Sequence, residues 1–206
     1  MKKILLYGDS NTWGHNPLDC TQLPKTWGKV AAELLPECEI TIDGECGRAT
    51  LEGEGPKHGI ATFRERYFVK KSDFDLIVIM LGTNDVLALL QYEPERTAQA
   101  LRQYIKETRA VYGDKAPRFL IISPILVRDN CLKHPIFSEL YNQKSVDDSK
   151  RFADVIYKMT QEEGVDFMNA ANYAVASDID GIHMVTEEHE KLGKAAAEKI
   201  KEILKL

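Results

Sequence analysis

The sequence has few cysteines, no long hydrophobic run and no excess of positive charge. Its four cysteines among 206 residues (Cys20, Cys38, Cys46 and Cys131) include no C-x-x-C pair, so neither a zinc knuckle nor a disulfide framework is indicated and we expect free thiols. No apolar run approaches the ~20 residues that a membrane span needs. With 27 Lys and Arg against 32 Asp and Glu, the net charge is −5, and no basic face predicts nucleic-acid binding.

The first residues do not predict a secretory signal, and we expect no linker that would divide the sequence. The apolar stretch behind Lys2 and Lys3 ends at Gly8, well short of the hydrophobic region of a signal peptide. Hydrophobic residues make up 44% of the chain, too many for a disordered protein, and we find no repeats or glycine-serine tracts. We therefore predict one domain spanning residues 1–206 in a cytoplasmic protein that binds neither membrane nor nucleic acid.

Short apolar runs alternate with segments of helical periodicity. The runs are residues 3–7, 39–42, 76–81, 119–123 and 165–168, and the helical segments are 27–34, 94–108, 152–159 and 186–203, the last with Thr186 placed to cap it. The run 76–81 is apolar throughout, which favours a strand buried on both faces. This alternation predicts an α/β fold in which helices cover both faces of a parallel sheet. Ligands of such a sheet bind outside the carboxyl ends of its strands.

The loops at those carboxyl ends match none of the common nucleotide or zinc motifs. Gly8 is followed by Asp9-Ser10-Asn11, which breaks the G-x-G-x-x-G fingerprint, and no P-loop or H-E-x-x-H sequence is present. The G-x-S-x-G elbow of ordinary α/β-hydrolases is missing too, because Thr12 stands where its second glycine would be.

A serine, an aspartate and a histidine in these loops suit ester hydrolysis. That reaction needs a hydroxyl that loses its proton, a base that works near neutral pH, and an acceptor that fixes the tautomer of the base. Ser10 follows the first predicted strand, and Asp180 precedes His183 by three residues across a glycine turn. Asp180 can therefore reach the distal ring nitrogen of His183, and the sheet places all three side chains at one edge.

Four motifs resemble the SGNH (GDSL-type) hydrolase family, in the order in which that family has them. They are Gly8-Asp9-Ser10, Gly47, Gly82-Thr83-Asn84-Asp85 and Asp180-Gly181-Ile182-His183, and together they span nearly the whole chain. Residues 7–14 and 47–50 look most similar to the bacterial arylesterase and acyltransferase branch. The resemblance implies a flavodoxin-like three-layer α/β/α fold with a five-stranded parallel sheet.

The resemblance also implies roles for individual residues. Ser10 would be the nucleophile, His183 the base and Asp180 the partner that orients it. The backbone N–H groups of Ser10 and Gly47 and the side-chain amide of Asn84 would form the oxyanion hole. Such donors stabilise the charge of the transition state, and the reaction needs no metal and no organic cofactor.

Other residues in these loops have structural interpretations beside functional ones. Trp13 and His15 are candidate substrate-binding residues, although Trp13 could be structural and His15 could face solvent. We expect Asp9 to brace its own loop, Asp85 to stabilise its turn or cap the next helix, and Gly44 to close the second strand with a turn. The stretch 127–144, which we expect to be irregular, carries Phe137 and Tyr141 and could confer specificity or join subunits of a homo-oligomer.

The sequence thus predicts a serine esterase that hydrolyses short-chain aryl or alkyl esters, or acetylated small molecules, through an acyl-enzyme. Acyl transfer follows if an alcohol replaces water. One alternative is a Mg²⁺-dependent phosphatase built on Asp9, Asn84 and Asp85, but the D-x-D pattern is absent and the Asp180–His183 pair has no role in it. Another alternative is a non-catalytic binding domain, which leaves every predicted reactive group without a use.

Overall fold

Five parallel strands form the centre of the computed structural model, which describes residues 1–51, 59–69 and 72–206. The strands are β1 (Lys2–Gly8), β2 (Cys38–Gly44), β3 (Leu76–Met80), β4 (Arg118–Ser123) and β5 (Asp166–Asn169). Their order is β2-β1-β3-β4-β5, and all neighbouring pairs are parallel. This is the flavodoxin-like order, whose binding crevice opens where β1 lies beside β3. The predicted sheet is confirmed, and each predicted strand lies within two residues of the observed one.

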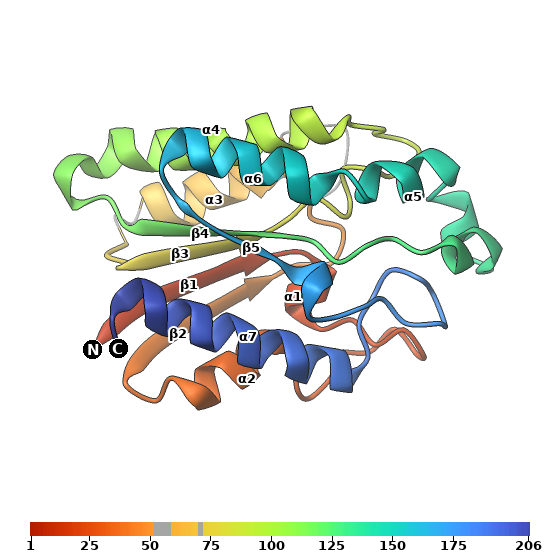
Figure 1. Cartoon of the computed structure of the whole chain (residues 1–206), viewed down its shortest axis with the longest axis horizontal. Coiled ribbons are helices and arrows are strands. Elements are labelled where there is room, and N and C mark those ends of the chain that lie inside the picture. Colours follow the sequence, from red (N-terminus) through yellow and green to blue (C-terminus); the bar gives the residue numbers. More distant parts are fainter. Residues whose placement is uncertain (52–58, 70–71) are drawn as a thin grey trace.

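Helices cover both faces of the sheet (Figure 1). Helices α2 (Trp27–Leu34) and α7 (Thr186–Leu204) lie on one face, and α3 (Gly59–Phe63), α4 (Pro94–Tyr112) and α6 (Phe152–Glu163) lie on the other. Because successive side chains of a strand point to opposite faces, Leu5 packs into the core under α4 and α6, whereas its neighbour Ile4 packs into the core under α2 and α7. The continuous apolar strands follow from this double burial.

Short elements lie in the connections between the strands and the longer helices. They are α1 (Ser10–Trp13), α5 (Gln143–Ser149), a π-helical turn (Arg64–Phe68) and single 3₁₀ turns at Gly113–Lys115, Asp129–Lys133, Phe137–Glu139 and Ala170–Asn172. The stretch after β4 is therefore more regular than we expected. Helix α5 starts there at a capping box, in which Asn142 and Ser145 each bind the other's backbone N–H group through a side chain.

Helix α7 begins differently from the prediction. Val185 is the N-cap residue and Thr186 is the first helical residue, so Thr186 is not the cap. Instead, the carboxylate of Glu188 in the first turn accepts a hydrogen bond from the backbone of Val175 at 2.9 Å and ties the helix to the preceding loop.

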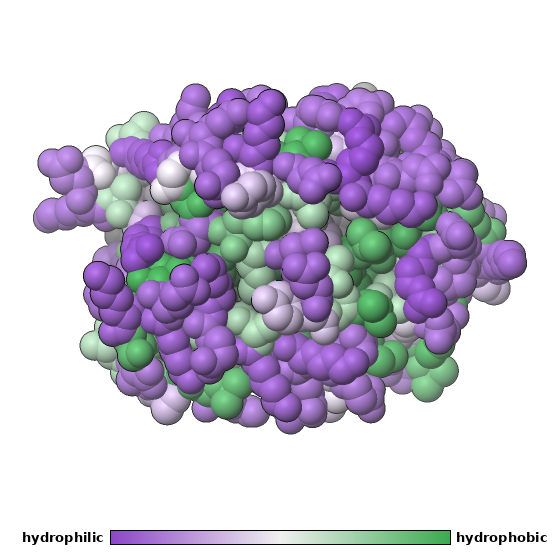
Figure 2. Space-filling model, viewed as in Figure 1, coloured by the Kyte–Doolittle hydropathy of each residue, from purple (hydrophilic) through white to green (hydrophobic). Residues whose placement is uncertain are grey.

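The molecular face drawn in Figure 2 is mainly hydrophilic. Among the described helices, none combines the length and the apolar composition needed to cross a bilayer.

Candidate active site

Ser10 lies on the first turn after β1. Asp9 is the N-cap of α1, and its carboxylate accepts a hydrogen bond from the backbone of Asn11 at 2.9 Å, which is the brace that we predicted. The turn requires glycine at position 8, because a Cβ there would lie 2.0 Å from Oγ1 of Thr12. Asp9 is buried, and burial raises its pKa to about 6 although the Asn11 hydrogen bond acts in the opposite direction.

The side chains of Ser10, His183 and Asp180 form one chain of hydrogen bonds. Oγ of Ser10 lies 2.9 Å from Nε2 of His183, and Nδ1 of His183 lies 2.6 Å from Oδ2 of Asp180. Ser10 and His183 are separated by 173 residues of sequence and are each only 4% exposed. The structure therefore brings together the three residues that the sequence predicted at one edge of the sheet.

The other oxygen of Asp180 fixes the orientation of this carboxylate. Oδ1 accepts hydrogen bonds from Oγ of Ser177 and from the backbone N–H groups of Ile182 and His183, at 2.9, 2.9 and 3.0 Å. Burial raises the pKa of Asp180, but the hydrogen bond with His183 and these backbone donors outweigh it and hold the pKa below its usual value. Gly181 makes the tight turn with φ of 72°, a left-handed conformation that favours glycine.

Asn11 joins the Ser10 turn to the His183 loop. Its side-chain amide donates to the carbonyl of Ile182 at 3.1 Å, and its side-chain oxygen accepts from the backbone of Met184 at 3.2 Å. These two contacts flank His183 on both sides along the chain. Sequence reasoning did not assign this role to Asn11, because an asparagine beside a turn is common and carries no specific signal.

The loops after β2 and β3 meet through Asn84. Its side-chain amide donates to the backbone carbonyl of Arg48 at 3.1 Å, which places it beside the segment that contains Gly47. Gly47 has φ of 81°, again in the left-handed region.

Gly44 does not close β2 with a turn as we expected. It is the last residue of the strand, and a Cβ there would lie 2.2 Å from the backbone nitrogen of Trp13, so glycine allows α1 to approach β2 closely.

Arg48 is a fully buried cation that the sequence did not reveal. Its guanidinium donates to the carbonyls of Gly8 and Asp43 at 2.8 and 2.7 Å, and to the carboxylates of Asp43 and Glu45 at 2.8 and 2.9 Å. It also lies 4.0 Å from the ring centre of Tyr7. The contacts show that it ties the loop after β2 to the end of β1.

Asp85 links this same loop to α4 and not to its own turn. Its carboxylate accepts hydrogen bonds from the backbone and hydroxyl of Thr50 and from the hydroxyl of Thr97. Burial raises the pKa of Asp85 against the effect of these donors. The phosphatase alternative depended on Asp9 and Asp85, but Asp9 uses its carboxylate to hold its own turn and Asp85 uses its carboxylate to hold the loop after β2.

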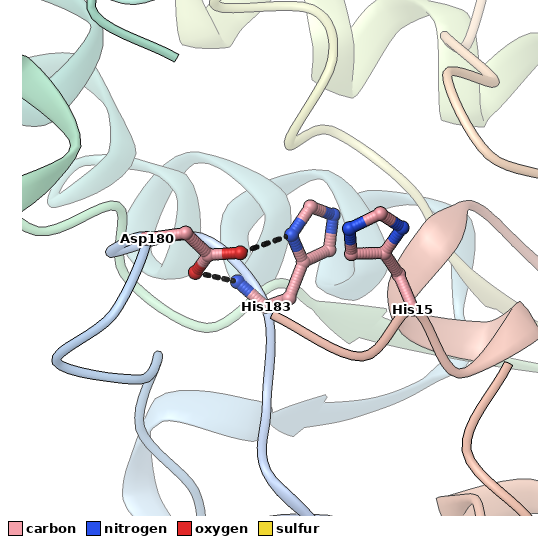
Figure 3. Close-up of side chains that lie close together, drawn as sticks. All are labelled: His15, Asp180 and His183. Atoms are coloured by element: carbon pink, nitrogen blue, oxygen red, sulfur yellow. Dashed lines mark hydrogen bonds and ion pairs between the residues drawn. The ribbon is translucent and has the colours of Figure 1, made fainter. Parts of the chain in front are cut away.

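His15 packs against His183 and is only partly exposed to solvent. The two ring centres are 4.0 Å apart with an angle of 34° between the planes, and Figure 3 shows Asp180 on one side of His183 and His15 on the other. Burial lowers the pKa of His15 to about 4, and a positive charge on His183 acts in the same direction with a smaller effect. Trp13 lies farther out, with its ring centre 6.4 Å from that of His15.

The same histidines offer donor atoms for a metal. Ring nitrogens of His15 and His183 and a carboxylate oxygen of Asp180 all lie within 4.8 Å of one another, and they form the one His, Cys, Asp and Glu cluster of this kind in the described ranges. Zinc accepts such donors. A metal on either nitrogen of His183 would replace its contact with Ser10 or with Asp180, so the donor set fits an inhibitory ion better than a resident cofactor.

The rim loop after β4 contributes a second aromatic contact. The ring centre of Phe137 lies 5.5 Å from that of His183. Tyr141 is 4% exposed, and its hydroxyl donates to the carbonyl of Thr83 at 3.3 Å. The side chain of Tyr141 therefore holds the rim loop against the end of β3, and the role of this loop in a homo-oligomer stays a prediction.

The chain is similar to known esterases in sequence and in fold. It matches the model of the GDSL-like lipase/acylhydrolase family over residues 6–189, whereas no curated protein matches it. The native aryl esterase of M. smegmatis is 25% identical, with a TM-score of 0.89 over 98% of this chain and 99% of that one. Est24, a carbohydrate acetylesterase from Sinorhizobium meliloti, shares the fold at 24% identity, with a TM-score of 0.89 over 98% of this chain and 100% of that one. Since the family match covers most of the chain, including the Ser10 turn and the His183 loop, this protein belongs to the GDSL-like lipase/acylhydrolase family of carboxylic ester hydrolases.

Proposed function

We propose that the protein is a serine esterase that hydrolyses short-chain esters of small alcohols and phenols through an acyl-enzyme. The observation that carries the proposal is the continuous hydrogen-bond chain from Ser10 through His183 to Asp180. A hydroxyl, an imidazole and a carboxylate in this order supply a nucleophile, a base and the group that orients the base.

In the first half of the reaction, Oγ of Ser10 attacks the ester carbonyl carbon while Nε2 of His183 takes its proton. Asp180 stabilises the resulting imidazolium at Nδ1. The bond between the carbonyl carbon and the alcohol oxygen then breaks, and His183 returns the proton to that oxygen as the alcohol leaves. Water, deprotonated by His183, attacks the acyl group on Ser10 and releases the carboxylic acid. An alcohol in place of this water would give acyl transfer.

Three donors would bind the oxyanion: the backbone N–H groups of Ser10 and Gly47 and the side-chain amide of Asn84. The contact between Asn84 and the Arg48 carbonyl uses one amide hydrogen and leaves the second for the substrate. A neutral amide suits this role because it donates without acting as a base. Each donor of this kind contributes about 3 kcal/mol to the transition state, which is roughly 10²–10³ in rate.

The small acyl group rests on similarity. Residues 7–14 and 47–50 resemble the arylesterase branch, and an aryl esterase and a carbohydrate acetylesterase share the fold. The name of the carbohydrate acetylesterase describes an acetyl ester, whose acyl chain is short. No step of the mechanism needs a metal or an organic cofactor.

A series of p-nitrophenyl esters from acetate to decanoate, assayed with the parent and with Ser10→Ala, tests the proposal. We expect kcat/KM to fall as the acyl chain lengthens, and Ser10→Ala to lower it by at least about 10³-fold on the acetate. Equal melting temperatures of the two proteins would show that the loss is chemical. A folded Ser10→Ala protein that keeps more than a tenth of the parent activity would remove Ser10 from the mechanism.

A further inference from the structure

His15 has a buried polar atom for which the described residues offer no hydrogen-bond partner. Its Nε2 has almost no solvent contact, and the described residues give it no hydrogen bond. A buried polar atom without a partner is unfavourable, and Nε2 of His15 is one of seven such side-chain atoms among the described residues. This atom belongs to a ring that stacks on His183, which makes a ligand of the active site its natural partner.

The position of His15 determines which part of the substrate it can reach. In the proposed mechanism, Nε2 of His183 must lie within hydrogen-bond distance of the alcohol oxygen when it returns the proton. A ring nitrogen of His15 lies within 4.8 Å of a ring nitrogen of His183, on the side of the imidazole opposite Asp180 (Figure 3). His15 therefore borders the alcohol part of the ester near its reacting oxygen.

The charge of His15 determines what kind of group it can bind. At neutral pH the ring is uncharged, because burial beside His183 lowers its pKa to about 4. A neutral imidazole has one donor and one acceptor nitrogen, and a hydroxyl group can pair with either. A carboxylate or an ammonium group would be buried next to it without an opposite charge, which is costly.

We propose that His15 binds a free hydroxyl on the alcohol part of the substrate, and that the enzyme consequently prefers monoesters of diols and polyols. The hydroxyl would sit on the carbon next to the esterified one, so that it reaches His15 while the ester oxygen reaches His183. This inference rests on the proposed esterase function and adds the class of alcohol to it. Trp13 and Phe137, whose rings flank this pair of histidines, would enclose the carbon skeleton of the alcohol.

Two acetates that differ only in this hydroxyl test the inference: ethyl acetate and 2-hydroxyethyl acetate. The quantity to compare is the ratio of their kcat/KM values, measured by acid release for the parent, for His15→Phe and for His15→Gln. Phenylalanine keeps an aromatic ring but cannot form hydrogen bonds, whereas glutamine keeps a donor and an acceptor. Because each ratio refers to one protein, differences in stability or in absolute rate between the variants cancel.

We expect the kcat/KM of the hydroxyethyl ester relative to that of the ethyl ester to fall about tenfold in His15→Phe, because one hydrogen bond to an otherwise unpaired group is lost. In His15→Gln this ratio should recover partly. The same ratio in all three proteins would overturn the inference. If His15→Phe does not fold, His15→Leu serves as the variant without hydrogen bonds, and the same comparison applies.

The esterase proposal and this inference fail in different ways. If both esters are hydrolysed and Ser10→Ala abolishes the reaction, the esterase proposal holds and the ratios alone decide the role of His15. If hydrolysis does not depend on Ser10, the esterase proposal fails, and the inference that rests on it falls with it whatever the ratios are.

Discussion

Replacing Asp180 by asparagine should disable His183 without displacing it. Three donors contact Oδ1, from Ser177, Ile182 and His183, and they require an oxygen at that position. The amide nitrogen of the asparagine must then take the place of Oδ2, 2.6 Å from Nδ1 of His183. Since that nitrogen is a donor, Nδ1 must become the acceptor and the ring proton moves to Nε2. In this tautomer His183 cannot accept the proton of Ser10.

The size of the effect follows from the cost of restoring the productive tautomer. Rotating the amide would place its NH₂ group against the three donors and sacrifice their hydrogen bonds, at about 1 kcal/mol each. A total of about 3 kcal/mol leaves the productive arrangement in roughly one molecule in a hundred. The variant also lacks the carboxylate charge that stabilises the imidazolium, so we expect kcat to fall by about 10³–10⁴-fold in all.

The assay is the hydrolysis of p-nitrophenyl acetate near neutral pH, with thermal unfolding to confirm that Asp180→Asn is folded. Asp178→Asn is a matched control, because the side chain of Asp178 is 89% exposed and pairs only with Arg128 among the described contacts. We expect the control to keep the parent kcat. A folded Asp180→Asn protein with kcat within tenfold of the parent would refute the tautomer argument.

Two further variants test features outside the hydrogen-bond chain of the active site. Arg48→Lys keeps the charge but offers one nitrogen to the four acceptors that the guanidinium reaches. We expect urea unfolding to show a free energy of unfolding lower by about 2–4 kcal/mol. An unchanged free energy of unfolding would contradict the role of Arg48. His189→Gln tests the pH dependence of stability. Burial lowers the pKa of His189 to about 4 in the folded protein, whereas the unfolded chain binds a proton at this residue below the ordinary pKa of 6.5. The free energy of unfolding therefore falls as the pH drops below 6.5. Glutamine can still accept the hydrogen bond from the Trp27 backbone, so between about pH 7 and about pH 5 the parent should lose about 2 kcal/mol more unfolding free energy than the variant. Equal losses would show that His189 does not titrate in this way.

The fold could be predicted because burial on both faces leaves a direct trace in the sequence. The run 76–81 corresponds to β3, whose residues are all buried, and the alternation with amphipathic helices indicated the parallel sheet. Strand ends were less predictable. Gly44 suggested a turn, but in the structure Gly8 and Gly44 are paired residues at the ends of β1 and β2, where the absence of side chains lets α1 pack closely.

The contacts that hold the active site could be predicted only in part. The edge of a parallel sheet gathers the loops after its strands, which is why Ser10 could be expected near His183. The position of His15 has no such rule behind it. It depends on a fold-back of the loop, in which His15 forms an isolated antiparallel bridge with Gln22 and the side chain of Gln22 donates to the carbonyl of Trp13. No periodicity in the sequence indicates these contacts.

In the proposed mechanism, the side chains that hold the loop after β2 affect the rate as well as the stability. This loop supplies Gly47, yet long-range side-chain contacts hold it: Arg48 binds the end of β1, Asn84 binds the Arg48 carbonyl, and Asp85 and Tyr104 bind Thr50. Oxyanion donors lower the barrier only if they are already in place when the charge develops. A substitution that loosens this loop would therefore weaken binding of the transition state more than binding of the substrate. Such a variant should lower kcat with little change in KM, and this separates a positioning role from a role in substrate binding.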